Sequence, residues 1–105
     1  MSDLEEKLVK LCDGIRALVD WEAELRESGE TDRAENVRVH LIQMIEFAAR
    51  IQASTRGGLC AKRESLSAIA NAGPDIDGSA AVRALRASID NDSKRFSAEP
   101  GRFLN

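Results

Sequence analysis

The chain has 105 residues, of which 43% are hydrophobic, 31% charged and only 4% aromatic, with a formal net charge of −3. These values are ordinary for one globular domain, while the few aromatic residues argue against a β-rich fold and the many Ala, Leu, Arg and Glu residues favour helix. Residues 1–52 carry a net charge of −5 and residues 53–105 a net charge of +2, which argues against a nucleic-acid surface on the first half.

The compartment can be anticipated from the first residues and from the cysteines. The opening MSDLEEKLVK is acidic and polar, unlike a signal peptide, and no apolar run approaches the ~20 residues that cross a bilayer. Cys12 and Cys60 form neither a disulfide framework nor a metal-binding spacing. We therefore expect reduced thiols, a cytoplasmic location and no membrane partner.

A first helix is predicted over about residues 3–28. Ser2 and Glu5 fit the S-x-x-E capping box at its start, and Gly29 ends it. Apolar residues recur within it at steps of three and four, as on one face of a helix. This first stripe consists of Leu4, Leu8, Leu11, Ile15, Leu18 and Leu25.

A second helix is predicted over about residues 31–55, capped by Thr31 or Asp32 and ended by the Arg-Gly-Gly sequence at 56–58. Its stripe consists of Ala34, Val37, Leu41, Met44, Ala48, Ile51 and Thr55. When the chain reverses at Gly29, the two stripes meet position for position. This register predicts a long antiparallel helical hairpin.

One position of the first stripe, opposite Val37, is the carboxylate Glu22. In the simpler interpretation the 3.6-residue helical period drifts by about 20° per heptad, so that Trp21 fills the interface and Glu22 lies at its edge. Arg38 would then pair with Glu22 as a partly exposed ion pair. In the other interpretation Glu22 is buried, which requires a partner because an unpaired buried carboxylate costs several kcal/mol.

Both helices carry a second apolar row that the hairpin contact leaves uncovered. An exposed apolar patch of several hundred Å² is rare on a monomer, so either the rest of the chain or another subunit must cover these rows. They form the predicted interaction surface: Val9, Cys12 and Val19 on the first helix, and Val39, Ile42, Ile45 and Ala49 on the second.

The second half predicts two shorter helices, over about residues 59–72 and 79–95, separated by Gly73-Pro74 and a loop. Residues 1–96 are expected to form a single helical domain, and residues 97–105 an irregular C-terminal tail. The predicted fold is all-α: a long antiparallel helical hairpin plus two shorter helices, four-helix-bundle-like and completed by dimerisation.

No arrangement of residues predicts catalysis, a metal or a cofactor. His40, the only histidine, lacks the Glu-x-x-His spacing of di-metal bundles, and Cys12 falls on a mid-helix apolar row where thiols are inert. The sequence around Asp75 and Asp77 lacks the acidic first and twelfth positions of a calcium loop. We therefore expect no enzymatic activity and no cofactor.

The remaining interpretation is a small non-catalytic protein–protein interaction module, such as an adaptor, an antiactivator or a chaperone-like regulator. It would act as a helical homodimer that also binds another protein. The alternative is a small nucleic-acid-associated regulator that contacts phosphates. Its candidate contacts are the basic residues Arg83, Arg86, Lys94 and Arg95, among which carboxylates are interleaved.

Overall fold

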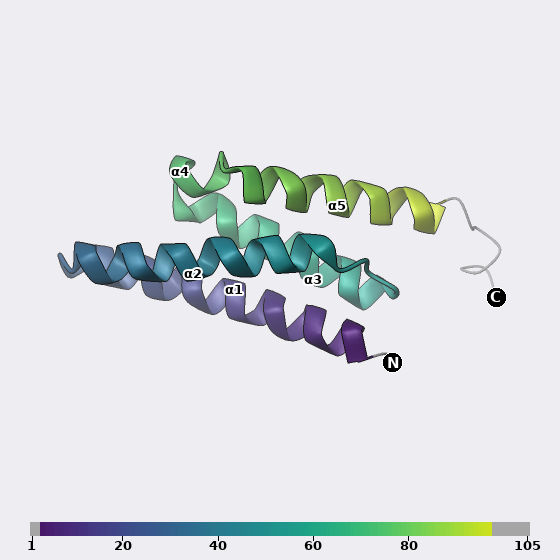
Figure 1. Cartoon of the computed structure of the whole chain (residues 1–105), viewed down its shortest axis with the longest axis horizontal. Coiled ribbons are helices and arrows are strands. Elements are labelled where there is room, and N and C mark those ends of the chain that lie inside the picture. Colours follow the sequence, from purple (N-terminus) through teal and green to yellow (C-terminus); the bar gives the residue numbers. More distant parts are fainter. Residues whose placement is uncertain (1–2, 98–105) are drawn as a thin grey trace.

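The computed structural model describes residues 3–97, and all regular structure within this range is helical, as predicted (Figure 1). The elements are α1 (Asp3–Glu27), α2 (Thr31–Arg50), α3 (Arg56–Ile69), the short 3-10 helix η1 (Ala70–Ala72), α4 (Pro74–Asp77) and α5 (Ala80–Ser97). The predicted cap Ser2, and residues 98–105 of the predicted tail, lie outside the described residues. The first residue of that tail, Ser97, still belongs to α5.

α1 and α2 pack against each other along the predicted hairpin, and the chain reverses at Gly29. This glycine has a φ of +79°, in the left-handed region that side chains with a Cβ disfavour. Its N–H donates to the carbonyl of Arg26, and the N–H of Glu30 donates to the carbonyl of Leu25, which is the Schellman arrangement. Glu30 occupies the N-cap position of α2 without a side-chain bond, so the predicted cap at Thr31 or Asp32 is wrong.

The second helix ends five residues before its predicted limit, because the Arg-Gly-Gly sequence opens α3 instead of closing α2. α2 stops at Arg50, and Ile51 has an extended backbone. Thr55 is the N-cap of α3, and its hydroxyl accepts a hydrogen bond of 3.1 Å from the N–H of Gly58. Threonine is a favoured N-cap residue, and here it overrides the usual meaning of two consecutive glycines.

Glu5 connects the start of α1 to the segment between α2 and α3. Its buried carboxylate accepts hydrogen bonds from the N–H groups of Ser54 (3.0 Å) and Thr55 (3.2 Å) and from both of their hydroxyl groups. Burial alone would raise the pKa of Glu5, but these four bonds stabilise the charged form and hold the pKa below its ordinary value. Gly58 permits this approach, since a Cβ there would lie 2.8 Å from the carboxyl carbon of Glu5.

α3 and α5 cover one side of the hairpin. α3 packs on α1, α5 packs on α2, and α3 and α5 contact each other, within an envelope of 52 × 24 × 18 Å (Figure 1). The shared core includes Leu8, Cys12, Ile15, Leu41, Ile45, Ile69, Val82 and Leu85. The rest of the chain therefore covers most of the second apolar rows of the hairpin, with Val39 the exposed exception.

Glu22 lies inside the hairpin interface, whereas Trp21 is directed outward. The exposed fractions are 2% for Glu22 and 46% for Trp21, so the expectation that Trp21 fills the interface is wrong. Two guanidinium groups hold the buried carboxylate: Nε of Arg26 at 2.8 Å and Nη2 of Arg38 at 3.5 Å. The predicted pair with Arg38 is present, and Arg26 supplies the additional partner that burial requires.

A second buried ion pair joins α3 to α5. Lys62 is fully buried, and its Nζ lies 2.6 Å from Oδ2 of Asp92 and 2.7 Å from the hydroxyl of Ser88. Asp92 also accepts from the N–H of Ala53 at 3.2 Å and from Nη2 of Arg95 at 3.0 Å. These contacts fasten both α3 and α5 to the segment that follows α2.

Candidate functional site

The seven residues of the predicted interaction surface are divided between core and surface. Cys12 and Ile45 are 0% exposed and Val19 is 5% exposed, so their assignment to a free surface is wrong: α3 and α5 cover the side on which they lie. Val39 is 55% exposed. The other three are partly buried: Val9, Ile42 and Ala49.

The opposite side of the hairpin, here called the outer face, presents apolar residues to solvent. Three large side chains on it are exposed: Leu4 (60%) and Trp21 (46%) on α1, and Phe47 (55%) on α2. Two grooves on this face are lined only by residues of α1, α2 and Ile51, which directly follows α2, and a further cavity beside Phe47 is lined by Gln43, Glu46, Phe47 and Arg50 of α2.

The larger groove, here called the basic-rimmed groove, has a volume of about 500 Å³. Apolar side chains form its floor, and three cationic side chains stand at its rim. Its lining residues are Leu11, Met44, Phe47 and Ile51 from the floor, and Lys7, Lys10 and Arg50 from the rim. A Cβ at Gly14 would lie 2.5 Å from the Met44 methyl group, so this glycine lets Met44 lie close against α1.

The smaller groove, of about 280 Å³, lies nearer the tip of the hairpin. It is lined by Trp21, Leu25, Arg33, Asn36, Val37 and His40. Neither groove has a carboxylate among its lining residues, although the first half of the chain is acidic. These two grooves are therefore apolar without an acidic lining residue, whereas Glu46 lines the adjoining cavity beside Phe47 and Arg50.

The cations of the outer face differ in how far they are already neutralised. Lys7 and Lys10 have neither an ion-pair nor a hydrogen-bond partner among residues 3–97. Arg50 lies over the Phe47 ring, with its guanidinium carbon 5.9 Å from the ring centroid, and Arg33 pairs with Glu30 at 3.0 Å. The two lysines thus keep their charges available to a binding partner.

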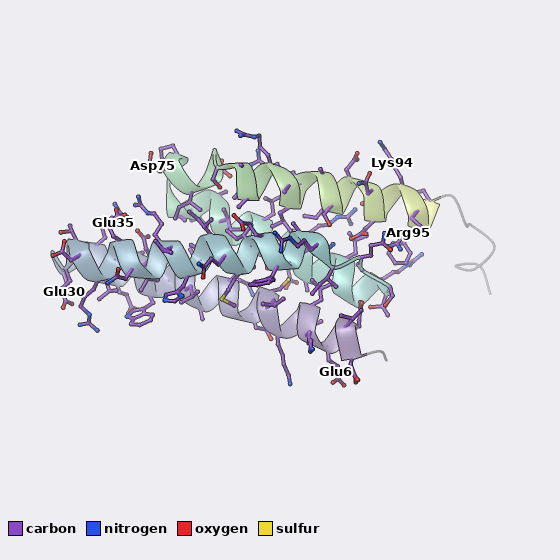
Figure 2. All side chains as sticks on the ribbon, in the orientation of Figure 1. Glu6, Glu30, Glu35, Asp75, Lys94 and Arg95 are labelled. Carbon is purple, nitrogen blue, oxygen red and sulfur yellow. The ribbon has the colours of Figure 1, made fainter. Side chains whose placement is uncertain are left out.

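The four residues of the nucleic-acid alternative each contact an acceptor of their own chain. Nη1 of Arg83 donates to the Gly78 carbonyl at 3.0 Å, and the pairs Arg86–Asp77, Lys94–Asp90 and Arg95–Asp92 have N···O distances of 2.9, 3.1 and 3.0 Å. They also form no single patch. Arg83 and Arg86 contact Gly78 and Asp77, at the end of the molecule where Figure 2 labels Asp75. Lys94 and Arg95 lie toward the C-terminal end of α5, far from Asp75 (Figure 2).

The groups considered for chemistry lie apart from one another. His40 borders the smaller groove, Cys60 is exposed, and burial raises the pKa of the Cys12 thiol. Within the described range, no three His, Cys, Asp or Glu side chains gather in a way that could hold a metal ion. In the same range, no helix has the length and apolar character needed to cross a membrane.

The sequence pointed to the hairpin but not to its outer face. The missed residues are Leu11, Met44 and Ile51, which were assigned to the contact between the helices, and the exposed Phe47. The sequence did contain one indication of the outer face. Trp21 and Phe47 lie next to the two paired stripes, so the apolar surface of the two helices is wider than a single helix–helix contact needs. Comparison of the chain with models of protein families, with curated proteins and with solved structures finds no match.

Proposed function

We propose that the chain is a small non-catalytic protein-binding module, of the adaptor, antiactivator or chaperone-like kind. In this proposal the helices form a four-helix-bundle-like scaffold, and the outer face of the hairpin is the surface that another protein contacts. The observation that carries it is the exposure of two aromatic side chains at apolar grooves: Phe47 at the basic-rimmed groove and Trp21 at the smaller one. Contiguous exposed apolar surface on a small protein typically marks an interaction site, and aromatic residues contribute strongly at such sites.

A homodimer remains the second proposal for the occupant of this surface. Most residues of the second apolar rows, which favoured dimerisation, lie against α3 and α5, so these residues no longer require a second subunit, whereas Val39 stays exposed. If two outer faces met about a two-fold axis with their basic-rimmed grooves opposed, Lys7, Lys10 and Arg50 of one copy would face the same three cations of the other. Like charges placed opposite each other weaken such a contact, so a different protein is the better partner.

Site-specific photo-crosslinking tests the proposal. A photoreactive phenylalanine derivative replaces Phe47 in the cells that make the protein, and the same derivative replaces Val39 as a matched control. Both positions are 55% exposed on α2, but only Phe47 lines the basic-rimmed groove. We expect position 47 to give one or a few discrete protein adducts that position 39 does not give.

Identical adduct patterns at the two positions, or none at position 47, would refute the proposal. An adduct with twice the mass of the chain, found only at position 47, would identify a second copy as the occupant. The crosslink therefore separates a foreign partner from self-association, and it does so before the partner has been identified.

A further inference from the structure

We infer that the occupant of the basic-rimmed groove is an acidic amphipathic helix of another protein. This inference rests on the proposed function and adds the chemistry of the partner. It is carried by the shape of the groove between α1 and α2 and by the charge of its border. The first observation concerns the apolar floor of the groove, and the second concerns the cationic side chains at its border.

The shape suits a third helix laid along the hairpin. From Lys7 to Trp21 the outer face extends over about 14 residues of α1, or roughly 21 Å at 1.5 Å per residue, which is close to four helical turns. Between Lys10 and Trp21 the same edge of α1, at steps of three and four, carries only Gly14 and Ala17. The Met44 methyl group fills the space over Gly14, and the small side chain of Ala17 leaves room beside it for another helix.

The floor of the groove specifies the apolar face of that helix. Leu11, Met44 and Ile51 are partly buried and line a concave surface, with Phe47 standing beside them. Apolar side chains spaced three and four apart on a partner helix would insert between α1 and α2 in the manner of helix-in-groove recognition. A flat bilayer surface would reach the protruding Leu4 and Phe47 but would fill the concave floor less completely.

The border specifies the charge of the partner. Lys7, Lys10 and Arg50 line the groove, in a chain whose net charge is −3, and the nearest acidic lining residue is Glu46 of the adjoining cavity on the Arg50 side. Lys7 and Lys10 have no partner among residues 3–97, whereas Lys62, Arg86 and Lys94, on other elements, are each paired with an aspartate. Asp or Glu residues flanking the apolar face of a bound helix would complement these free charges, as opposite potentials do across specific interfaces.

Three labelled synthetic helices test this inference against the full chain by fluorescence anisotropy. Each carries the same Leu residues at steps of three and four, and the flanking positions are Glu in the first peptide, Gln in the second and Lys in the third. We expect the Glu peptide to bind roughly 10-fold or more tightly than the Gln peptide, and the Lys peptide to bind more weakly still. Phe47→Ala should weaken binding of the Glu peptide by roughly 10-fold.

Charge reversal locates the site. In the Lys7→Glu, Lys10→Glu variant, the Glu peptide should lose its advantage and the Lys peptide should become the tighter ligand. Lys94→Glu is the control: this lysine is also exposed but lies on α5, and its reversal should leave the order of the peptides unchanged. All substituted side chains are exposed, so circular dichroism should show an unchanged thermal midpoint.

Several results would overturn the inference. Equal affinity for the three peptides, still dependent on Phe47, would refute the acidic partner and leave a protein-binding groove in place. Equal effects of Lys94→Glu and the double reversal would show an unlocalised charge effect, and failure of all three peptides to bind would refute the helical occupant. Retention on vesicles of anionic phospholipid, lost on the double reversal while no peptide binds, would identify a membrane surface instead. The crosslink at Phe47 judges the proposed function separately.

Discussion

The contact between Glu5 and Gly58 supports a sharp prediction, because a single added methyl group would occupy the space of a buried carboxylate. A Cβ at position 58 would lie 2.8 Å from the carboxyl carbon of Glu5 and closer still to Oε1. The carboxylate has little freedom to move aside, since Ser54 and Thr55 hold it with four hydrogen bonds. Gly58→Ala should therefore break the connection between α1 and the start of α3.

The magnitude follows from the donors that lose their acceptor. Glu5→Ala leaves the N–H groups of Ser54 and Thr55 without their carboxylate, and at about 1–3 kcal/mol for each unsatisfied group we expect a loss of about 2–6 kcal/mol. Gly58→Ala should cost about 1–3 kcal/mol, since replacing a helical glycine returns up to about 1 kcal/mol. In the Glu5→Ala background the clash is gone, and Gly58→Ala should be neutral or stabilising.

The assay is urea unfolding followed by circular dichroism at 222 nm for the wild type, both single variants and the double variant. The expected coupling energy between the two positions is about 1–4 kcal/mol, against the 5–15 kcal/mol of total stability typical of a small domain. Gly57→Ala is the matched control, because its nearest neighbour, the Thr55 hydroxyl, would lie an ordinary 3.6 Å away. If Gly58→Ala cost the same with and without Glu5, the reasoning would be refuted.

Three further predictions concern buried groups. Because the folded-state pKa of Glu5 lies below its ordinary value of 4.5, its contribution to stability is present above that value and is lost as the pH falls through the folded pKa. Urea midpoints measured between neutral pH and pH 3 should fall less in Glu5→Gln than in the wild type, and parallel profiles would contradict this. Asp92→Ala leaves the ammonium of Lys62 buried without its counter-ion and should lower the free energy of unfolding by about 3–5 kcal/mol. Lys62→Met combined with Asp92→Leu should recover part of this loss. A loss below about 1 kcal/mol for Asp92→Ala would show that the pair is not needed for stability. Iodoacetamide should modify the exposed Cys60 of the native chain and leave Cys12 unmodified, because burial raises the pKa of the Cys12 thiol. Mass spectrometry of tryptic peptides measures the extent of modification at each cysteine. Equal rates of modification would contradict the burial of Cys12.

The hairpin could be predicted from the sequence because the pattern that specifies it is local and periodic. Two apolar stripes at helical spacing and a glycine between them determine α1, α2 and the turn at Gly29 without reference to the rest of the chain. The start of α3 could not be predicted from such a local pattern. Its cap Thr55 depends on Glu5, about 50 residues away along the chain, and no periodic pattern records such a contact.

The surface was harder to locate because each helix of the hairpin is apolar on more than one side. The sequence showed that one side lies between α1 and α2, but deciding which other side α3 and α5 would cover requires their long-range packing. The prediction placed the interaction surface at residues that include Cys12 and Ile45, and the chain covers these two residues itself. Exposed apolar surface remains on the other side, at Trp21 and Phe47.

At two places in α1, a buried carboxylate is adjacent to an exposed apolar side chain, which stability of the fold alone does not explain. Glu5 is buried and its neighbour Leu4 is exposed, and Glu22 is buried beside the exposed Trp21. Folding alone favours the reverse order, since burying a large apolar side chain stabilises by about 1.5–3 kcal/mol whereas a buried carboxylate requires dedicated partners. The chain supplies those partners at both places and leaves the apolar neighbours in water. Local departures of this kind from what stability requires are expected at functional positions, which agrees with a surface completed by a binding partner.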